Sequence, residues 1–341
     1  MVSVTMALFL SENWSPLKVN GIALFSGGLD SIIAVKLIQE QGIEVTGLTF
    51  STPFFGGRNA RAAAEKINLP LDVLDITGKH LSMLKAPRYG YGRNMNPCID
   101  CHTLMLKKAG ERMQEFQADF IFTGEVLGQR PMSQTRQSLR LASKNSGFEP
   151  FILRPLSAKL LPVTRPEDEG KVDRTRLLDI QGRGRKKQME LAKHYGIKEY
   201  SNPAGGCLLT DPMFSRRLQD LFQRSPDARI RDIELLKYGR HFRIGEGIKV
   251  IVGRNQKDNE MLLKLSDDSD TVITVIDYPG PLTLVPSGCD RKALGDAASL
   301  CVFYSDAPKD SRVETICRTG TIQTFLTAKA SSREDTEHWR I

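Results

Sequence analysis

The chain has 341 residues, of which 40% are hydrophobic and 7% aromatic, so it can bury a core and is not an intrinsically disordered protein. Its length favours two domains over one. The net charge of +8 suits a polyanionic partner such as RNA. The apolar run Met6–Leu10 is too short to span a bilayer, so we expect a cytoplasmic protein without a membrane partner. Six cysteines in a chain of this length argue against a disulfide scaffold.

The first motif is the segment Ser26–Ser31, which reads SGGLDS and joins the apolar run Gly21–Phe25 to the helical pattern Ile32–Ile38. Two glycines let the backbone approach an anion, and the helix presents N–H groups and the positive end of its dipole. The pattern predicts a phosphate site, and the alternative is a glycine-rich turn without a ligand. The expected phosphate-site residues are Ser26, Gly27, Gly28, Asp30 and Ser31, with Asp30 also helping to place Mg²⁺.

Strand and helix signals then alternate along the chain. Strands are expected at 43–50, 71–76 and 119–125, and helices at 60–67 and 104–116. Repeated βα units predict a doubly wound parallel sheet with ligands at the carboxyl ends of its strands. We therefore expect Phe50 and Ser51 near adenine or ribose, and the Gly124–Glu125 turn near the reacting α-phosphate.

The glycine loop has neither the GxxxxGK[ST] nor the GxGxxG spacing. It resembles the pyrophosphate loop (PP-loop) of ATP pyrophosphatases, which cleave ATP between the α and β phosphates and adenylate a substrate. The segments Thr123–Thr135 (TGEVLGQRPMSQT) and Leu153–Leu156 (LRPL) resemble the tRNA 4-thiouridine synthase branch of these enzymes. The resemblance implies an adenine nucleotide alpha hydrolase-like fold, the use of ATP and Mg²⁺, tRNA as partner, and ATP contacts from Gly124 and Gln134.

Three cysteines form a candidate sulfur site. Cys98 and Cys101 form a CxxC pair ahead of the expected helix, and Cys207 lies in the turn Pro203–Leu209. Three thiolates suit a [4Fe–4S] cluster with one open iron. A redox pair that carries a persulfide, or structural zinc with His102 as fourth ligand, are the alternatives. The set is similar to that of cluster-dependent thiolation enzymes, which favours the cluster, whereas the familiar 4-thiouridine synthases use other cysteine arrangements.

The two motifs are linked by chemistry, so we expect the three sulfur atoms to meet beside the nucleotide crevice. A uracil carbonyl oxygen leaves only after AMP is transferred to it, and sulfide can then attack the carbon. The expected function is a tRNA sulfurtransferase that makes 4-thiouridine, with 2-thiouridine second, and that takes sulfide or a donor such as a cysteine desulfurase. A homodimer is compatible with this. The alternatives are a small-molecule amidotransferase or sulfur-insertion enzyme, and a non-catalytic RNA-binding protein.

The remaining cysteines do not share this pattern. Their spacing is irregular, and we expect buried or incidental thiols at Cys289, Cys301 and Cys317.

A basic stretch at 165–187 includes Gly182 and Gly184, which predict a mobile loop able to fold against phosphate or RNA. A solvated insertion is the alternative. The RNA-binding candidates in this stretch are Arg183, Arg185, Lys186 and Lys187.

We expect an N-terminal arm at 1–18, the PP-loop domain at 19–225 and a second domain at 226–341. In the second domain, β-branched runs at 248–252, 272–276 and 283–285, with a helix at 291–303, predict a small α+β fold. It resembles the NFACT RNA-binding domain at three landmarks, which are Val252–Glu260, Asp277–Pro281 and Ala297–Ser305. The resemblance implies RNA contacts from Arg254, Asn255 and Lys257, and a simple strand-end turn is the alternative.

Overall fold

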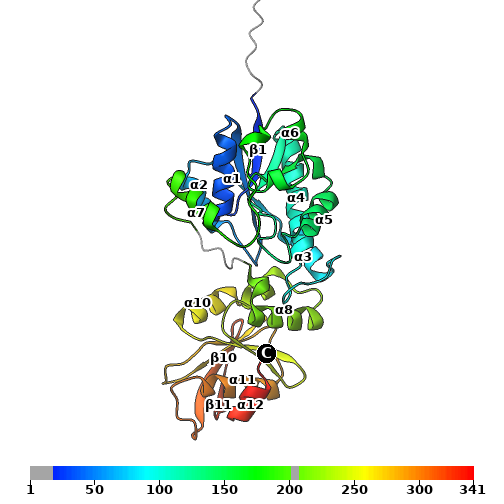
Figure 1. Ribbon diagram of the computed structural model, residues 1–341. Coiled ribbons are helices and arrows are strands. Elements are labelled where there is room, and N and C mark those ends of the chain that lie inside the picture. The colour runs from blue at the N-terminus through cyan, green and yellow to red at the C-terminus, as the bar shows by residue number, and fades with distance from the viewer. Residues whose placement is uncertain (1–17, 201–206) are drawn as a thin grey trace, which may run out of the picture. The chain divides into compact units, whose positions relative to one another are not determined.

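The structure is a computed structural model that describes residues 18–200 and 207–341 (Figure 1). The expected arm at 1–18 lies outside the described residues except for Lys18. The chain divides into two compact units. The first unit comprises Met1–Thr52, Gly56–Gly90 and Pro97–Ala204, and the second comprises Pro53–Phe55, Tyr91–Asn96 and Gly205–Ile341.

The first unit is built on a five-stranded sheet in the order β3-β2-β1-β4-β5, and every pairing in it is parallel. This confirms the predicted parallel α/β fold. The strands are β1 (Asn20–Leu24), β2 (Glu44–Ser51), β3 (Leu71–Asp75), β4 (Phe120–Thr123) and β5 (Ile152–Leu153). The helices are α1 (Leu29–Gln39), α2 (Arg58–Lys66), α3 (Thr77–Lys85), α4 (Cys98–Glu115), α5 (Arg136–Ser146), α6 (Arg165–Asp168) and α7 (Lys186–His194).

Helix α1 is central to the core of this unit. Its residues Ile32, Ile33 and Val35 are at most 1% exposed, because α1 is covered by the sheet on one side and by neighbouring helices on the other. Helices α1, α2 and α7 lie on one side of the sheet, and α3, α4 and α5 lie on the other (Figure 1). The first unit is therefore a three-layer fold with apolar strands buried on both faces.

Strand β1 lies at the point where the strand order reverses. It pairs with β2 on one side and with β4 on the other, and Leu24 is opposite both Leu48 and Thr123. Parallel sheets bind ligands at such a switch point, beyond the carboxyl ends of the strands. The turns after β1 and after β4 therefore meet at this edge of the sheet.

The second unit is built on a six-stranded antiparallel sheet in the order β11-β10-β8-β9-β7-β6. Its strands are β6 (Arg240–Ile244), β7 (Ile248–Val252), β8 (Thr271–Val275), β9 (Thr283–Val285), β10 (Val313–Thr319) and β11 (Ile322–Ala328). Its helices are α8 (Pro212–Arg224), α9 (Ile230–Leu235), α10 (Gln256–Leu265), α11 (Arg291–Phe303) and α12 (Arg333–His338).

The two faces of this sheet are covered differently. The main core forms where α11, through Ala297, Cys301 and their neighbours, packs against Ile273 and Cys317. On the other face Leu262 of α10 packs with Ile251 and Leu284. The predicted runs at 248–252 and 283–285 and the predicted helix at 291–303 are all present, whereas β6, β10 and β11 were not anticipated.

Helix α8 belongs to the second unit, although the sequence analysis placed it before the boundary at Ser225–Pro226. The reason is an ionic contact with the second sheet. Asp220 of α8 accepts hydrogen bonds from Arg243 at 2.8 Å and from Lys249 at 3.2 Å. Burial opposes ionisation of Asp220, but these two cations outweigh it and lower its pKa.

One local expectation needs correction. Helix α4 begins at Cys98, directly after Pro97, and not near residue 104. Both cysteines of the CxxC pair therefore lie in the first turn of the helix. Among the helices within 18–200 and 207–341, none combines the length and apolar character that crossing a bilayer requires.

Candidate nucleotide site

The turn after β1 has a backbone that only glycine can adopt. Gly27 has φ of +75°, and a Cβ atom there would lie 2.5 Å from the carbonyl oxygen of Asn59. The turn is held by short-range hydrogen bonds: the Ser31 hydroxyl donates to Gly28 O at 2.8 Å, and Gly28 N donates to Ser26 Oγ at 3.3 Å. Gly28 is the N-cap of α1 and supplies no side-chain cap. The first-turn N–H groups of α1 are therefore available to an anion, as the motif predicts.

The turn after β4 lies against this loop. A Cβ atom at Gly124 would approach the backbone of Asp30 and Ser31 to 2.6 Å, so glycine is required there for close approach. A few residues on, the Gln129 amide donates to Asp30 Oδ2 at 3.1 Å. The structure thus brings together the two sequence segments that were expected to bind ATP.

Asp30 is in an unusual electrostatic environment for a carboxylate. Burial raises its pKa, while the Gln129 hydrogen bond and the positive charges of Arg185 and Arg130 act in the opposite direction. Its Oδ1 atom is buried and has no hydrogen-bond partner among residues 18–200 and 207–341. An unpartnered buried carboxylate oxygen beside two arginines is suited to a bound cation or a hydrated ligand.

Other unpartnered polar atoms accompany Asp30. Gln188, on α7, is fully buried and interacts with Asp30, whose pKa it lowers, but among the described residues neither of its amide atoms has a partner within ordinary hydrogen-bond distance. Arg185 Nε and Gln134 Oε1 are likewise buried without partners. Buried polar groups in folded proteins are nearly always satisfied, so such a set indicates a polar ligand.

The other expected nucleotide contacts lie at the end of β2. Ser51 is the last residue of β2, and its carbonyl accepts a hydrogen bond from Ile76 N at 3.1 Å. The Phe50 side chain is buried in the core, so this residue offers a ligand only its backbone. Their contact with adenine or ribose stays a prediction.

The CxxC pair lies in the same unit as the loop. Cys98 is half-buried, and burial raises the pKa of its thiol, although the positive charge of Arg130 lowers it. Since Arg130 also acts on Asp30, it links the cysteine helix electrostatically to the PP-loop. Cys101 is buried, with its Sγ atom 3.6 Å from Nε2 of His80, a residue whose pKa burial lowers to about 4.

The residues beside the cysteines have partners of their own. Asp100 accepts hydrogen bonds from the backbone N–H groups of Arg88 and Tyr89, at 3.1 and 3.0 Å. His102 Nδ1 lies 2.8 Å from Glu125 Oε1. The zinc alternative would use the other ring nitrogen of His102, Nε2, and the Glu125 contact would then orient the ring, so this contact leaves the zinc alternative open.

Glu125 is the centre of a network that sequence reasoning missed. Besides His102, it accepts a hydrogen bond from Arg154 Nε at 3.0 Å, and Arg154 also donates to Ser143 Oγ at 3.0 Å. Burial opposes the ionisation of Glu125, but Arg154 and His102 outweigh it and lower its pKa to about 2. The network joins α4, the residue after Gly124 and the LRPL segment, so it fixes the cysteine helix against the ATP-proximal turn.

Cys207 belongs to the second unit and lies just before the 3₁₀ turn Leu208–Thr210. Within residues 18–200 and 207–341, no three His, Cys, Asp or Glu side chains lie close enough to hold a metal ion. The meeting of Cys207 with Cys98 and Cys101 stays a prediction.

The other cysteines are engaged in packing. Cys301 is fully buried in α11, and burial raises the pKa of its thiol to about 11. Cys317 is buried in the same core. At Cys289, burial likewise raises the pKa of the thiol to about 11. These values are consistent with unreactive thiols at pH 7.

The basic loop before α7 is attached to the site. Gly182 N donates to Leu127 O at 2.7 Å, and Gln181 forms a β-bridge with Leu127. This attachment places Arg185 beside Asp30. Lys187 forms an ion pair with Asp179 at 2.8 Å, while Arg183 and Lys186 are exposed. The RNA contacts expected from these four residues stay predictions.

In the second unit, the candidate RNA residues surround the start of α10. Asn255 is its N-cap and accepts a hydrogen bond from Asp258 N at 2.9 Å. Arg254 donates through Nε to Asp258 Oδ2 at 2.6 Å. Asn255 and Arg254 thus have structural partners, and Lys257 is exposed.

Two different families match two separate segments of the chain. Residues 18–159 match the family described as thiamine biosynthesis protein (ThiI). Residues 239–340 match the family described as the NFACT protein RNA binding domain. The matches cover β1 to the LRPL segment in the first case and β6 to α12 in the second.

Curated relatives are similar over part of the chain. It is 24% identical to the tRNA-specific 2-thiouridylase MnmA of Symbiobacterium thermophilum over 62% of this chain and 57% of the relative. It is 24% identical to the MnmA of Methylobacterium nodulans over 70% of this chain and 67% of that protein. With the MnmA of Dehalococcoides mccartyi it shares 32% identity over 29% of this chain and 32% of the relative. The chain thus spans about one third to two thirds of the length of these relatives.

Solved structures add little. The C-terminal part of the fibronectin/fibrinogen-binding protein of Streptococcus suis has a TM-score of 0.29 at 14% identity, with 46% of this chain and 77% of that chain covered. The NMN synthetase of Francisella tularensis has a TM-score of 0.27 at 14% identity, with coverages of 56% and 91%. These scores are too low to establish a common fold. On the family matches and the strand order, the chain carries a ThiI-like PP-loop domain followed by a C-terminal NFACT RNA-binding domain.

Proposed function

We propose that the protein is an ATP-dependent tRNA sulfurtransferase, which adenylates a uridine carbonyl and replaces its oxygen with sulfur. The observation that carries the proposal is the set of unpartnered buried polar atoms around the SGGLDS loop: Asp30 Oδ1, Arg185 Nε and the Gln188 amide. A nucleotide satisfies such atoms, and the same chain carries an RNA-binding domain. The relatives named 2-thiouridylases supply the reaction class.

The loop and the residues around it would each contact a different part of ATP. The N–H groups at the start of α1 bind pyrophosphate oxygens, and the glycines at 27 and 124 permit the approach. Arg130 and Arg185 stabilise the charge that develops on the α-phosphate. The free oxygen of Asp30 is a fitting ligand for Mg²⁺, which would neutralise phosphate charge. Gln134 and Gly124 complete the contacts on the β4 side.

The reaction balances without a redox step. The uridine carbonyl oxygen attacks the α-phosphorus, the bond to the β-phosphate oxygen breaks, and pyrophosphate leaves. Hydrosulfide then attacks the activated carbon, and AMP leaves with the former carbonyl oxygen. One ATP and one sulfide are consumed for each thiouridine formed. Sulfide, or a donor such as a cysteine desulfurase, is the second substrate.

The cysteines fit a [4Fe–4S] cluster better than zinc. The available donors are thiolates, Cys98 and Cys101 are one helical turn apart, and Arg130 favours the ionised form of Cys98. Cys98, Cys101 and Cys207 would hold the cluster, which when bound supplies an iron with an open position for hydrosulfide. The persulfide pair remains the second candidate. Zinc is the third, because zinc needs four protein ligands and His102, the fourth donor, directly follows Cys101 in the chain.

The product is 4-thiouridine or 2-thiouridine. The TGEVLGQ and LRPL segments and the ThiI match favour 4-thiouridine, and the relatives named 2-thiouridylases favour the other carbonyl. Because both reactions consume ATP identically, only the nucleoside distinguishes them. We place 4-thiouridine first, in a homodimeric or monomeric cytoplasmic enzyme.

The deciding experiment is nucleoside analysis of tRNA after incubation with the anaerobically purified protein, ATP, Mg²⁺ and sulfide. We expect AMP, pyrophosphate and one thiouridine in equal amounts. AMP formation that needs no tRNA, with no thionucleoside formed, would instead support a small-molecule substrate. Binding of tRNA without any ATP cleavage would support a non-catalytic RNA-binding protein.

The cysteine chemistry is tested on the same preparation. We expect a brown protein containing iron and acid-labile sulfide, and a colourless Cys98→Ala variant. Cys289→Ala is the matched control and should stay brown, because Cys289 packs against the core of the second unit. A colourless wild-type protein with stoichiometric zinc would reject the cluster.

A further inference from the structure

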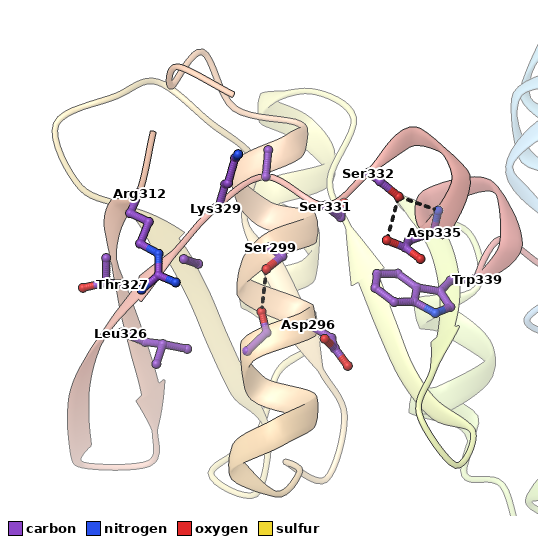
Figure 2. A pocket seen from close by; sticks show the side chains of 13 residues that line it. Asp296, Ser299, Arg312, Leu326, Thr327, Lys329, Ser331, Ser332, Asp335 and Trp339 are labelled. Carbon is purple, nitrogen blue, oxygen red and sulfur yellow. Dashed lines mark hydrogen bonds between the residues drawn. The ribbon is translucent and has the colours of Figure 1, made fainter. Parts of the chain in front are cut away.

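The second unit contains a pocket that none of the residues discussed so far lines. It has a volume of about 420 Å³ and lies between α11, the end of β11 and α12 (Figure 2). Small-molecule sites in proteins begin at about 300 Å³, so the pocket is large enough for one nucleotide.

Two cations at the pocket lack partners. Arg312 precedes β10, Lys329 follows β11, and both are exposed. Across the described part of the chain, neither makes a hydrogen bond or an ion pair, whereas Arg231, Arg243 and Arg254 are all paired with carboxylates. Exposed cations that have no carboxylate partner favour a bound anion.

An aromatic ring stands across the pocket from these cations. Figure 2 shows the Trp339 indole on the opposite side of the pocket from Arg312 and Lys329. Trp339 is half-buried, since it also packs against the main core of the unit. An indole that is anchored by the core and open on another side is a rigid surface on which a base can stack.

Between the cations and the indole lie hydrogen-bonding groups of α11. Asp296 is half-buried and accepts no hydrogen bond, and burial and the nearby Asp335 raise its pKa. Ser299 donates to Gly295 O at 2.9 Å and presents its hydroxyl oxygen to the pocket (Figure 2). A carboxylate here disfavours a simple anion, but it accepts hydrogen bonds from a base amino group or a ribose hydroxyl.

We propose that this pocket binds one nucleotide of single-stranded RNA, with its phosphate at Arg312 and Lys329 and its base on Trp339. The inference builds on the proposed function, because it names where the NFACT domain grips the tRNA. Asp296 accepts from the base or the ribose. An unpaired nucleotide is required, since a stacked and paired base cannot reach an indole inside a pocket.

The test uses the fluorescence of Trp339. The chain has two tryptophans, so Trp14→Phe leaves Trp339 as the only one in the full-length protein. A short single-stranded oligoribonucleotide of mixed sequence should quench its emission saturably, and the fully paired duplex of the same sequence should not. Absence of quenching by the single strand, or equal quenching by the duplex, would overturn the proposal.

Variants in the same background sharpen the test. Arg312→Ala with Lys329→Ala should reduce the slope of log K against log salt by about 0.7, the value for one phosphate contact on a single strand. Arg318→Ala, on β10 but outside the pocket lining, is the matched control and should leave the slope unchanged. Trp339→Leu and Trp339→Phe leave no tryptophan in this background, so their affinity is measured by the fluorescence anisotropy of a labelled oligoribonucleotide. Trp339→Leu should weaken binding roughly 5- to 150-fold, whereas Trp339→Phe should retain most of the affinity.

Thermal unfolding of each variant checks that the fold survives, because Trp339 contributes to the core. The two proposals fail separately. Quenching that depends on Arg312 and Lys329, in a protein that forms no thiouridine, keeps the RNA pocket and rejects the sulfurtransferase. Thiouridine formation, with RNA affinity unchanged in the pocket variants, keeps the enzyme and rejects the pocket.

Discussion

Asp30 and Asp258 occupy the same local setting and have opposite environments. Each lies in the first turn of a helix that follows a strand and a turn, α1 after β1 and α10 after β7. Asp258 Oδ2 accepts hydrogen bonds from Gly239 N, Arg254 N and Arg254 Nε, at 3.1, 3.2 and 2.6 Å. Among the described residues, Asp30 has one partner within hydrogen-bond distance, Gln129, and a buried oxygen with none, although Gln188 also lowers its pKa.

The difference separates a structural acid from a functional one. Burial opposes ionisation at both residues, but at Asp258 the Arg254 contacts prevail and lower the pKa, whereas at Asp30 burial prevails and raises it. A strand–turn–helix motif alone does not distinguish the two cases. The unsatisfied polar atoms do, because buried polar groups are nearly always partnered, and a cluster of exceptions beside a phosphate loop favours a ligand there.

Substitution of the two acids gives the largest contrast. Asp30→Asn should lower AMP formation about 100- to 1000-fold, the usual effect of losing one preorganised charge-stabilising group, and should spare the fold. Asp258→Asn should leave AMP formation unchanged and lower the free energy of unfolding by about 1–3 kcal/mol, because buried backbone donors lose a charged acceptor. Steady-state AMP release and urea unfolding measure both. Equal loss of activity in the two variants would contradict the assignment.

Glu125 is a buried acid that, unlike Asp30, has hydrogen-bond partners for both carboxylate oxygens, so its substitution should affect stability. Folding lowers its pKa to about 2 from the ordinary 4.5, so the stabilisation is complete above pH 4.5 and is lost as the pH falls through about 2. Glu125→Gln should therefore reduce the free energy of unfolding at pH 7 by about 3 kcal/mol and flatten its decline in acid.

The control for Glu125 is Glu115→Gln on α4, where the acid forms an exposed pair with Arg112. Exposed pairs contribute under about 1 kcal/mol, so this variant should unfold almost as the wild type does. If both variants lose the same stability, the Glu125 network does not hold α4 in place.

The part of the site formed by one contiguous segment of the chain was predictable from the sequence. The SGGLDS turn, its flanking strand and α1 are contiguous, and glycine at 27 is dictated by the loop's own backbone. The parallel sheet was also predictable, because each strand is an apolar run followed by a helical pattern. The strand order then brings Gly124 to the loop, as an alternating βα chain requires.

The contributions from distant segments were not predictable. Arg185 was assigned to RNA because it lies among other basic residues, yet the Leu127–Gln181 bridge places it beside Asp30. His102, Glu125 and Arg154 come from three separate segments, and no spacing rule connects them. Strand β11 was missed because it is exposed over most of its length and lacks the alternation of a half-buried strand. Strand β10 does alternate between buried and exposed residues and could have been recognised.

Arg185 is therefore tested against its neighbour in the same loop. Arg185→Ala should lower AMP formation roughly 10- to 100-fold, since a hydrogen bond to a charged group contributes about 1.5–3 kcal/mol, and should leave tRNA affinity unchanged. Arg183→Ala, an exposed residue two positions earlier, should leave AMP formation unchanged. Loss of tRNA affinity in Arg185→Ala, with normal AMP formation, would restore the RNA-binding interpretation.

The smallest expected effects concern the turn before α10, where the structural and RNA-binding interpretations still compete. Lys257 is exposed, so Lys257→Ala should lower the salt slope of RNA binding by about 0.7 and leave stability unchanged if it contacts a phosphate. Arg254→Ala should instead cost about 1 kcal/mol of stability, because its guanidinium holds Asp258. An Arg254→Ala variant with unchanged stability and a reduced salt slope would show that Arg254 leaves Asp258 to reach RNA. In that case a satisfied carboxylate would no longer suffice to identify a structural turn, and the contrast between Asp30 and Asp258 would rest on Asp30 alone.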